Sequence, residues 1–210
     1  MVRFFRKFNA VRKAQLGADS RVLFGKGVDI FQKKTSEIIV EKGTFQLGLP
    51  LPKNYPYATR DRTVLILEEG SKLICKGNVF IAPGSTIKIR AGATVIFDGG
   101  NHIAHDCTIL CGRKIHFGQD ASVSWNVNLI DDDGHFFVNS EGKRLRRFYK
   151  PLIIGKKAGL QMNVTVPSGV TIGDSAVVGA NTVIRQDIPD RSLVYSTQKL
   201  EVKYGIQSPF

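Results

Sequence analysis

The sequence has few cysteines, a single tryptophan and no long apolar run. Its three cysteines cannot all pair within one chain, and none belongs to a Cys-x-x-Cys pair, so neither a disulfide framework nor a zinc site is indicated. No stretch approaches the roughly 18 consecutive apolar residues of a membrane-spanning helix, and the basic first segment lacks the apolar centre of a signal peptide. We therefore expect a cytoplasmic protein with reduced, partly buried thiols.

The positive charge of the chain is unevenly distributed. The 210 residues have a net charge of +12, and 42% of them are hydrophobic, which is enough for a folded domain with a core. Residues 1–34 and residues 142–157 each have a net charge of +7, so the rest of the chain is slightly acidic. Two local basic patches favour anionic groups such as phosphates or acidic glycans, and they argue against a nucleic-acid-binding domain.

A repeat of six residues runs through the second half of the sequence. Large aliphatic residues recur every six positions from Ile154 to Ile184. A small residue stands four positions after each of the first five aliphatics, namely Ala158, Val164, Val170, Ala176 and Thr182. This period fits neither an α-helix nor a plain alternating strand. It predicts short strands separated by corners, with three strands to each coil of a solenoid and the aliphatic side chains stacked in columns.

The same pattern continues less regularly towards the N-terminus. Phe117, Val123 and Leu129 keep the period of six, whereas glycine turns before them are spaced by seven and eight residues. We expect the β-helix domain at residues 62–188, with a loop excursion at residues 131–150 that is too polar for the interior of the solenoid. Residues 1–61 are expected to form a basic N-terminal helix and capping region, and residues 189–210 a C-terminal cap.

Residues 151–189 resemble the repeat segment of the hexapeptide-repeat acyltransferases, in particular the galactoside and maltose O-acetyltransferases and relatives that acetylate surface polysaccharides. The resemblance continues back to Phe117 and more loosely to Val64. It implies an all-β, left-handed parallel β-helix with a protruding loop and a basic N-terminal cap. It also implies a homotrimer, whose flat faces would pack around a three-fold axis, and acetyl transfer from acetyl-CoA to a sugar hydroxyl. Transfer to the amino group of a sugar is a close variant.

His135 stands at the head of the excursion, directly after three aspartates and a glycine. Its position and its spacing from Pro151 match the catalytic histidine of the family. A neutral imidazole near pH 7 can accept the proton of a hydroxyl whose oxygen attacks a thioester, and a neighbouring carboxylate can orient the ring. The resemblance therefore assigns His135 as the general base, with Asp131 and Asp133 as its candidate partners. The aspartates lack the ligand spacing of a calcium loop, so no metal site is expected.

Three residues that precede the excursion are candidates for contacts with the acceptor. His102 and His105 are expected to face outward from a coil, where His105 could line the acceptor cleft, because a zinc site would need further ligands at suitable spacing. Trp125 could stack on a sugar ring or pack at the trimer interface. Asn126 could donate a hydrogen bond to the sugar or belong to an asparagine ladder. The sequence leaves these alternatives open.

The resemblance places acyl-CoA against backbone amides, small residues and basic groups of the last coils. The matching positions in this chain are Gly159, Met162, Gly179, Ala180, Thr182, Arg185 and Lys203. Relatives commonly have Trp-Ile-Gly where this chain has Gly159-Leu160-Gln161, and a lysine where it has Gln186. Their Gly-x-Pro-Ala-Lys near the C-terminus is replaced by residues 196–200. These departures favour the alternative function, a non-catalytic β-helix that binds or assembles without acyl-CoA.

Two basic segments suggest further partners. Residues 143–150, KRLRRFYK, could contact the 3′-phosphate of CoA or an acidic glycan, or be a solvated loop. Residues 1–15 alternate basic and apolar residues and could rest on an anionic membrane surface or cap the solenoid. The expected partners are a carbohydrate or lipid-linked glycan acceptor and two further copies of the chain, and no nucleic acid.

Overall fold

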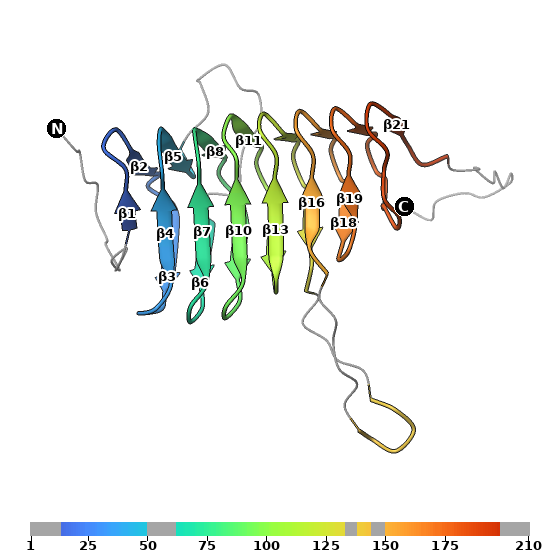
Figure 1. Ribbon diagram of the computed structural model, residues 1–210, viewed down its shortest axis with the longest axis horizontal. Helices are drawn as coiled ribbons and strands as arrows, with labels where there is room; N and C mark the ends of the chain where they lie inside the picture. The colour runs from blue at the N-terminus through green and yellow to red at the C-terminus, as the bar shows by residue number, and fades with distance from the viewer. Residues whose placement is uncertain (1–13, 50–61, 133–137, 144–149, 198–210) are drawn as a thin grey trace, which may run out of the picture.

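The chain forms a solenoid of β-strands. The computed structural model describes residues 14–49, 62–132, 138–143 and 150–197. Within these ranges the chain has β-strands and no α-helix, and therefore no helix that is long and apolar enough to cross a membrane. Each coil contributes one strand to each of three parallel sheets, so that most strands pair with the strand three places later (Figure 1).

The three sheets run the length of the solenoid. Sheet A consists of β1 (Ala14–Leu16), β4 (Glu37–Val40), β7 (Lys72–Cys75), β10 (Thr94–Phe97), β13 (Lys114–Phe117), β16 (Leu152–Ile154) and β19 (Thr171–Ile172). Sheet B consists of β2 (Arg21–Phe24), β5 (Thr44–Leu47), β8 (Val79–Ile81), β11 (Asn101–Ile103), β14 (Ser122–Val123), β17 (Gly159–Leu160), β20 (Val177–Val178) and β21 (Leu193–Val194). Sheet C consists of β3 (Val28–Gln32), β6 (Thr63–Leu67), β9 (Thr86–Ile89), β12 (Thr108–Cys111), β15 (Asn128–Ile130) and β18 (Thr165–Pro167).

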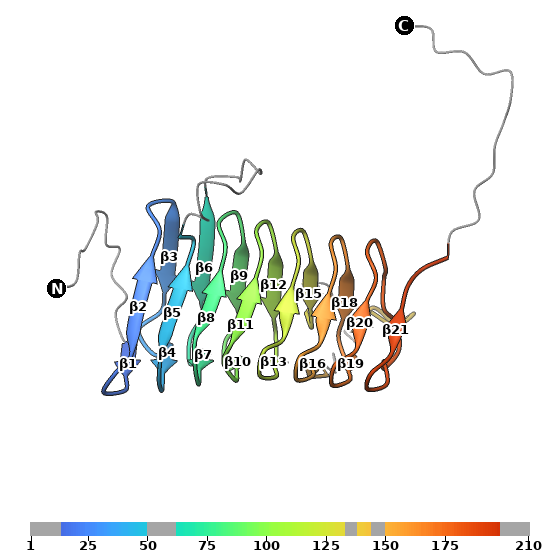
Figure 2. The ribbon, with the colours of Figure 1, turned by 90° about the horizontal axis from the view of Figure 1, so that it is seen from above.

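The coil is left-handed, as the resemblance implies. In Figure 1 the strands of sheet A point upward in front while successive coils advance to the right. Seen from above in Figure 2, the strands of sheet B then lead from this front face towards the back. A chain that rises in front, crosses to the back and advances to the right turns in the left-handed sense.

The interior is filled by columns of inward-facing side chains. The aliphatics and the small residues predicted from the period of six are buried, as Ile154 and Ala158 illustrate with no exposed surface. Larger side chains fill the earlier coils, where the rings of Phe97 and Phe117 stack with centroids 4.4 Å apart. Because each coil buries its inner surface against the next, the hydrophobic effect stabilises the stack as a whole rather than any one coil. The prediction of stacked columns is confirmed.

The solenoid extends beyond both ends predicted from the sequence. Strands β1 to β5 belong to the same three sheets, so the coils begin by Ala14 rather than at residue 62. At the other end β21 pairs with β20, which continues sheet B past residue 188. The early coils escape detection because they are longer: register partners are 22 residues apart between Leu73 and Val95 but 18 between Ile153 and Thr171. The predicted basic helix at the N-terminus falls mainly on residues 1–13, outside the described residues.

Candidate functional site

The base of the excursion is held by two consecutive aspartates that follow β15. The Asp131 carboxylate accepts hydrogen bonds from the backbone N–H of Gly112, of Arg113 at 3.1 Å and of Lys114 at 2.8 Å. Burial raises the pKa of Asp131, against the lowering effect of these amide bonds. Asp131 was one of the two candidate partners of His135, and in the structure its carboxylate binds the backbone at the corner of the preceding coil. His135 and Asp133 lie outside the described residues.

Asp132 anchors the same corner one residue later. Its side chain is almost fully buried and forms an ion pair with Arg90, which lies two coils earlier. The pair passes over Gly112, where a Cβ would lie 2.4 Å from the Asp132 Cβ, so only glycine leaves room for it. Together the two aspartates fasten the start of the excursion to the rigid body of the solenoid. Neither Arg90 nor Asp132 was singled out from the sequence, because their contact spans two coils.

The candidate acceptor residues lie at the corner between sheets B and C. The Trp125 ring stacks on the His105 ring with centroids 5.9 Å apart and an angle of 9° between their planes. His105 is 4% exposed and its ring stacks on the indole, so it does not present the open ring that was expected to line the acceptor cleft. His102 is exposed on sheet B, where its ring stacks on Phe80 at 4.9 Å and burial lowers its pKa. Trp125 itself is partly exposed.

Asn126 belongs to a ladder of asparagines at this corner. Its side-chain N–H donates to the Asn163 carbonyl at 2.7 Å, and the Asn163 amide donates to the Asn181 carbonyl at 2.8 Å. All three residues have a positive φ between 55° and 59°, a conformation that asparagine tolerates better than most residues. Of the two alternatives left open by the sequence, the structure therefore shows the ladder for Asn126.

The candidate donor residues lie on the next coils of the same corner. Gly179 is buried, and Met162 is 38% exposed. The backbone N–H of Ala180 donates to the Gln161 side-chain carbonyl at 3.2 Å, so the chain itself occupies this amide. The Thr182 hydroxyl donates to the Ala180 carbonyl at 3.4 Å and accepts from the Ser196 N–H at 3.1 Å. Arg185 is exposed, and Lys203 lies outside the described residues.

Gly159 leaves open space on the outer face of β17. A Cβ built there would meet only the Ser122 hydroxyl, at 3.9 Å. At the candidate donor corner there is therefore no side chain at Gly159, and the Gln161 side chain reaches the Ala180 amide. These are two of the positions at which the sequence departs from the pattern that it resembles.

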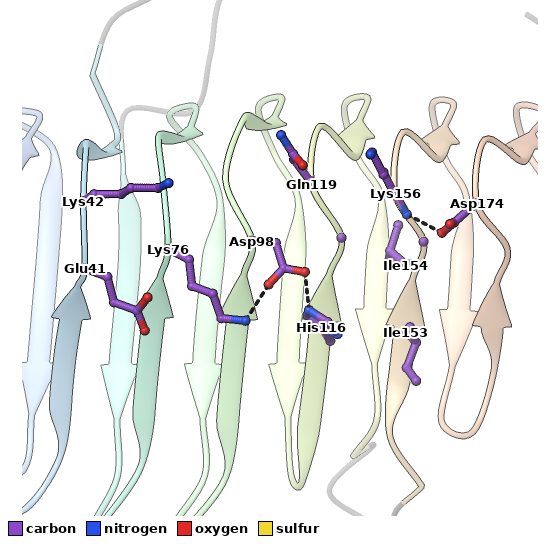
Figure 3. A pocket seen from close by; sticks show the side chains of 12 residues that line it. Glu41, Lys42, Lys76, Asp98, His116, Gln119, Ile153, Ile154, Lys156 and Asp174 are labelled. Carbon is purple, nitrogen blue, oxygen red and sulfur yellow. Dashed lines mark hydrogen bonds and ion pairs between the residues drawn. The ribbon is translucent and has the colours of Figure 1, made fainter.

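A second candidate site is a shallow groove of about 650 Å³ along the carboxyl ends of the sheet A strands (Figure 3). At its centre the Asp98 carboxylate lies between two partners, with its two oxygens 2.8 Å from the Lys76 ammonium and 2.8 Å from His116 Nε2. Burial tends to raise the pKa of Asp98, but these two hydrogen bonds outweigh it and hold the pKa below its ordinary value. The hydrogen bond to Asp98 is also the main reason why the pKa of Lys76 is raised.

Sequence reasoning did not find this groove. Lys76, Asp98 and His116 are separated by 22 and 18 positions in the chain, and only the coil lengths bring them together. The one signal that could have found them is the strand register, which aligns Cys75 with Phe97 and Phe97 with Phe117. The excursion connects β15 of sheet C to the amino end of β16, whereas the groove lies at the carboxyl end of β16. The groove and the excursion therefore lie at opposite ends of that strand (Figure 1).

The three cysteines are buried and free, as predicted. Burial raises the pKa of Cys107 to about 12 and that of Cys75 and Cys111 further still, so the thiols are unreactive near neutral pH. Among the residues described, no group of three or more His, Cys, Asp or Glu side chains is placed to hold a metal ion.

Comparison with known proteins confirms the resemblance seen in the sequence. The sequence model of the family described as bacterial transferase hexapeptide (six repeats) matches residues 151–186. The galactoside O-acetyltransferase of Escherichia coli is 27% identical over 97 residues, which cover 37% of this chain and 48% of the relative.

Two further relatives are similar to part of this chain. The putative lipopolysaccharide biosynthesis O-acetyl transferase WbbJ of Escherichia coli is 28% identical over 112 residues, covering 49% of this chain and 57% of the relative. The bifunctional protein GlmU of Methanococcus maripaludis is 30% identical over 128 residues, covering 60% of this chain and 29% of the relative. The chain spans less than two thirds of the length of each of these three relatives.

Proposed function

We propose that this chain, whose residues 151–186 match the family described as bacterial transferase hexapeptide, is an acetyltransferase that moves an acetyl group from acetyl-CoA to a sugar hydroxyl. The observation that carries the proposal is the family match at residues 151–186, on the coils directly after the excursion. Two of these relatives are named as O-acetyltransferases. The lipopolysaccharide relative supports a glycan of the cell surface as the acceptor and the cytoplasm, where acetyl-CoA is made, as the place of reaction.

His135 is the proposed general base. The acceptor oxygen attacks the thioester carbonyl while the imidazole takes the hydroxyl proton; the carbon–sulfur bond then breaks and the imidazolium returns the proton to the thiolate. Backbone N–H groups near the thioester stabilise the negative charge on the carbonyl oxygen. Asp131 and Asp132 act indirectly in this scheme, because their carboxylates fix the start of the excursion at Gly112 and Arg90.

The donor is proposed to lie along the corner formed by Gly159, Met162, Gly179, Ala180 and Thr182, with the phosphates near Arg185 and Lys203. The described part of this corner fits an extended, amide-bearing chain, because it offers open space at Gly159 and a backbone amide at Ala180. The Gln161 side chain must leave that amide for the donor to use it. A homotrimer, which would bring a neighbouring subunit to this corner, is part of the proposal.

Calorimetry with acetyl-CoA tests the proposal first. We expect binding at about one site per chain and a rise in the melting temperature with ligand, since a ligand that binds the native state stabilises it. His135→Ala should keep the oligomeric state and the binding but lose most acetyl transfer to sugars. No binding at millimolar acetyl-CoA would favour the non-catalytic β-helix instead, and full transfer by His135→Ala would remove that residue from the mechanism.

Gln161 offers a sharper test of where the donor lies. Gln161→Ala frees the Ala180 N–H, so acetyl-CoA should bind more tightly than to the unaltered protein if this amide contacts it. Gln186→Ala is the matched control, because Gln186 is also an exposed glutamine near the last coils. Equal affinities of the two variants would place the donor elsewhere.

A further inference from the structure

The outward face of sheet A carries an apolar row and a polar row side by side. The apolar row consists of Ile39, Ile74, Ile96 and Ile153, which are partly exposed and in register across the sheet with His116 between the last two. Two residues further along the same strands lie Glu41, Lys76 and Asp98, followed by Gly118 and Gly155. The groove follows the polar row and borders the apolar one at Ile153 (Figure 3).

The groove is long and narrow because it crosses successive coils. Its lining residues extend from the coil of Glu41 to that of Asp174, and neighbouring strands lie about 4.8 Å apart, so the steps from β4 to β19 span roughly 24 Å. Every coil along this path presents at least one side chain that donates or accepts a hydrogen bond. Gly118 and Gly155 have no side chains, so their backbone forms the floor of the groove beside His116.

The polar groups of the groove are largely fixed before any ligand arrives. Asp98 holds both Lys76 and His116, and the Asp174 carboxylate accepts the Lys156 backbone N–H at 2.7 Å. The three lysines and three acidic residues of the lining cancel in formal charge. A neutral groove of this kind does not suit a polyphosphate chain, whose binding depends on a surplus of cations.

We propose that this groove is a carbohydrate site that holds a chain of sugars along the solenoid axis. The rings of such a chain have an apolar C–H face that matches Ile153, where the apolar row borders the groove, and hydroxyl groups that match the fixed donors and acceptors at Lys76, Asp98 and His116. The site is open along its length, which allows a long chain to enter sideways. The inference rests on the proposed function only in taking the acceptor to be a glycan.

A separate site for the chain would give the enzyme a preference for long acceptors. A polymer held at the carboxyl ends of the sheet A strands reaches the excursion at the other end of β16 at a raised effective concentration, whereas a monosaccharide gains nothing from the groove. The groove therefore affects the KM for oligosaccharides and leaves the chemistry of transfer unchanged.

Direct binding is the first experiment. The full-length protein is applied to an array of immobilised neutral and acidic oligosaccharides, together with His116→Ala, Ile153→Asp and, as a control, Lys72→Ala. His116 and Ile153 border the groove, while Lys72 is exposed on the same sheet at the amino end of β7. We expect retention on at least one chain of several sugars, lost in the first two variants and kept in the control. Retention on none of them, or retention that the variants do not change, overturns the proposal.

Kinetics on a glycan that is retained separate this inference from the proposed function. His116→Ala and Ile153→Asp should raise the KM for the oligosaccharide about tenfold, the equivalent of one or two lost contacts, and leave the KM for the monosaccharide and for acetyl-CoA unchanged. Equal effects on short and long acceptors would refute the site. Array binding without any acetyl transfer would refute the proposed function and leave the carbohydrate site in the groove supported.

A change of oligomeric state in either variant, measured by analytical ultracentrifugation, would identify the outward face of sheet A as a subunit interface and overturn the inference.

Discussion

Two glycine-to-alanine substitutions should change stability in opposite directions. Gly118 is buried against the next coil, Gly159 is partly exposed, and neither has a positive φ. A Cβ at Gly118 would lie 2.6 Å from the Lys156 backbone nitrogen and 2.8 Å from the Gly155 carbonyl carbon. A Cβ at Gly159 would meet nothing closer than 3.9 Å. Gly118→Ala must therefore push two coils apart, whereas Gly159→Ala fits.

The magnitudes follow from these contacts. Overpacking against backbone that cannot rotate away costs about 1–3 kcal/mol, which lowers the melting temperature of a chain of this size by roughly 3–10 °C. At Gly159 the alanine reduces the freedom of the unfolded chain without strain, which stabilises the fold by about 0.4–1 kcal/mol and raises the melting temperature by a few degrees. Gly118→Ala weakens the packing of one coil on the next, and a stacked solenoid depends on such packing between every pair of neighbouring coils.

Thermal unfolding followed by far-ultraviolet circular dichroism measures both effects. The two variants and the unaltered protein should be compared at one protein concentration, because assembly of subunits would make the melting temperature depend on concentration. If Gly118→Ala and Gly159→Ala melt at the same temperature, the argument from close contact between coils is wrong.

Three further predictions concern single contacts. Asn163→Ala should cost about 1 kcal/mol more than Asn163→Gly in denaturant unfolding, because both break the ladder but only alanine is strained at a positive φ; equal costs would contradict this. The Asp98 pKa lies below its unfolded value, so its contribution is present above pH 4 and lost as pH falls below about 3.8; Asp98→Asn should flatten this acid limb of stability against pH. Arg90→Ala should cost about 2 kcal/mol by removing the ion pair of the buried Asp132 carboxylate, against less than about 1 kcal/mol for Lys88→Ala at the partly exposed pair with Glu68.

The C-terminal coils could be predicted in detail and the N-terminal coils could not. From Ile154 to Ile184 each coil has the same length, so inward residues recur at one period that the sequence displays. In the earlier coils the strands are longer, and the residues that stack are 20 or 22 positions apart. The sheets tolerate this variation in coil length, because hydrogen bonding requires only that each coil adds one strand to each of the three sheets.

The site could be predicted where it depends on a local motif. The excursion is visible as a polar interruption of the repeat, and Asn126 could be recognised as a member of a possible ladder. The burial of His105 under Trp125 and the use of Asp131 by three backbone amides could not be foreseen, because each depends on the height of one coil above another.

The sequence by itself determined the architecture of this protein: a six-residue period of aliphatic and small side chains can bury its apolar surface only as a stacked coil, and the polar interruption of that period predicts the excursion. Only the tertiary structure decided which side chains meet across coils. Lys76, Asp98 and His116 form one chain of hydrogen bonds, and Arg90 reaches Asp132, because register between parallel strands sets neighbours that are distant in sequence. The physical reason is that the period of the hydrophobic residues sets whether a side chain faces inward or outward, whereas the length of each coil sets which residues of the neighbouring coils lie beside it.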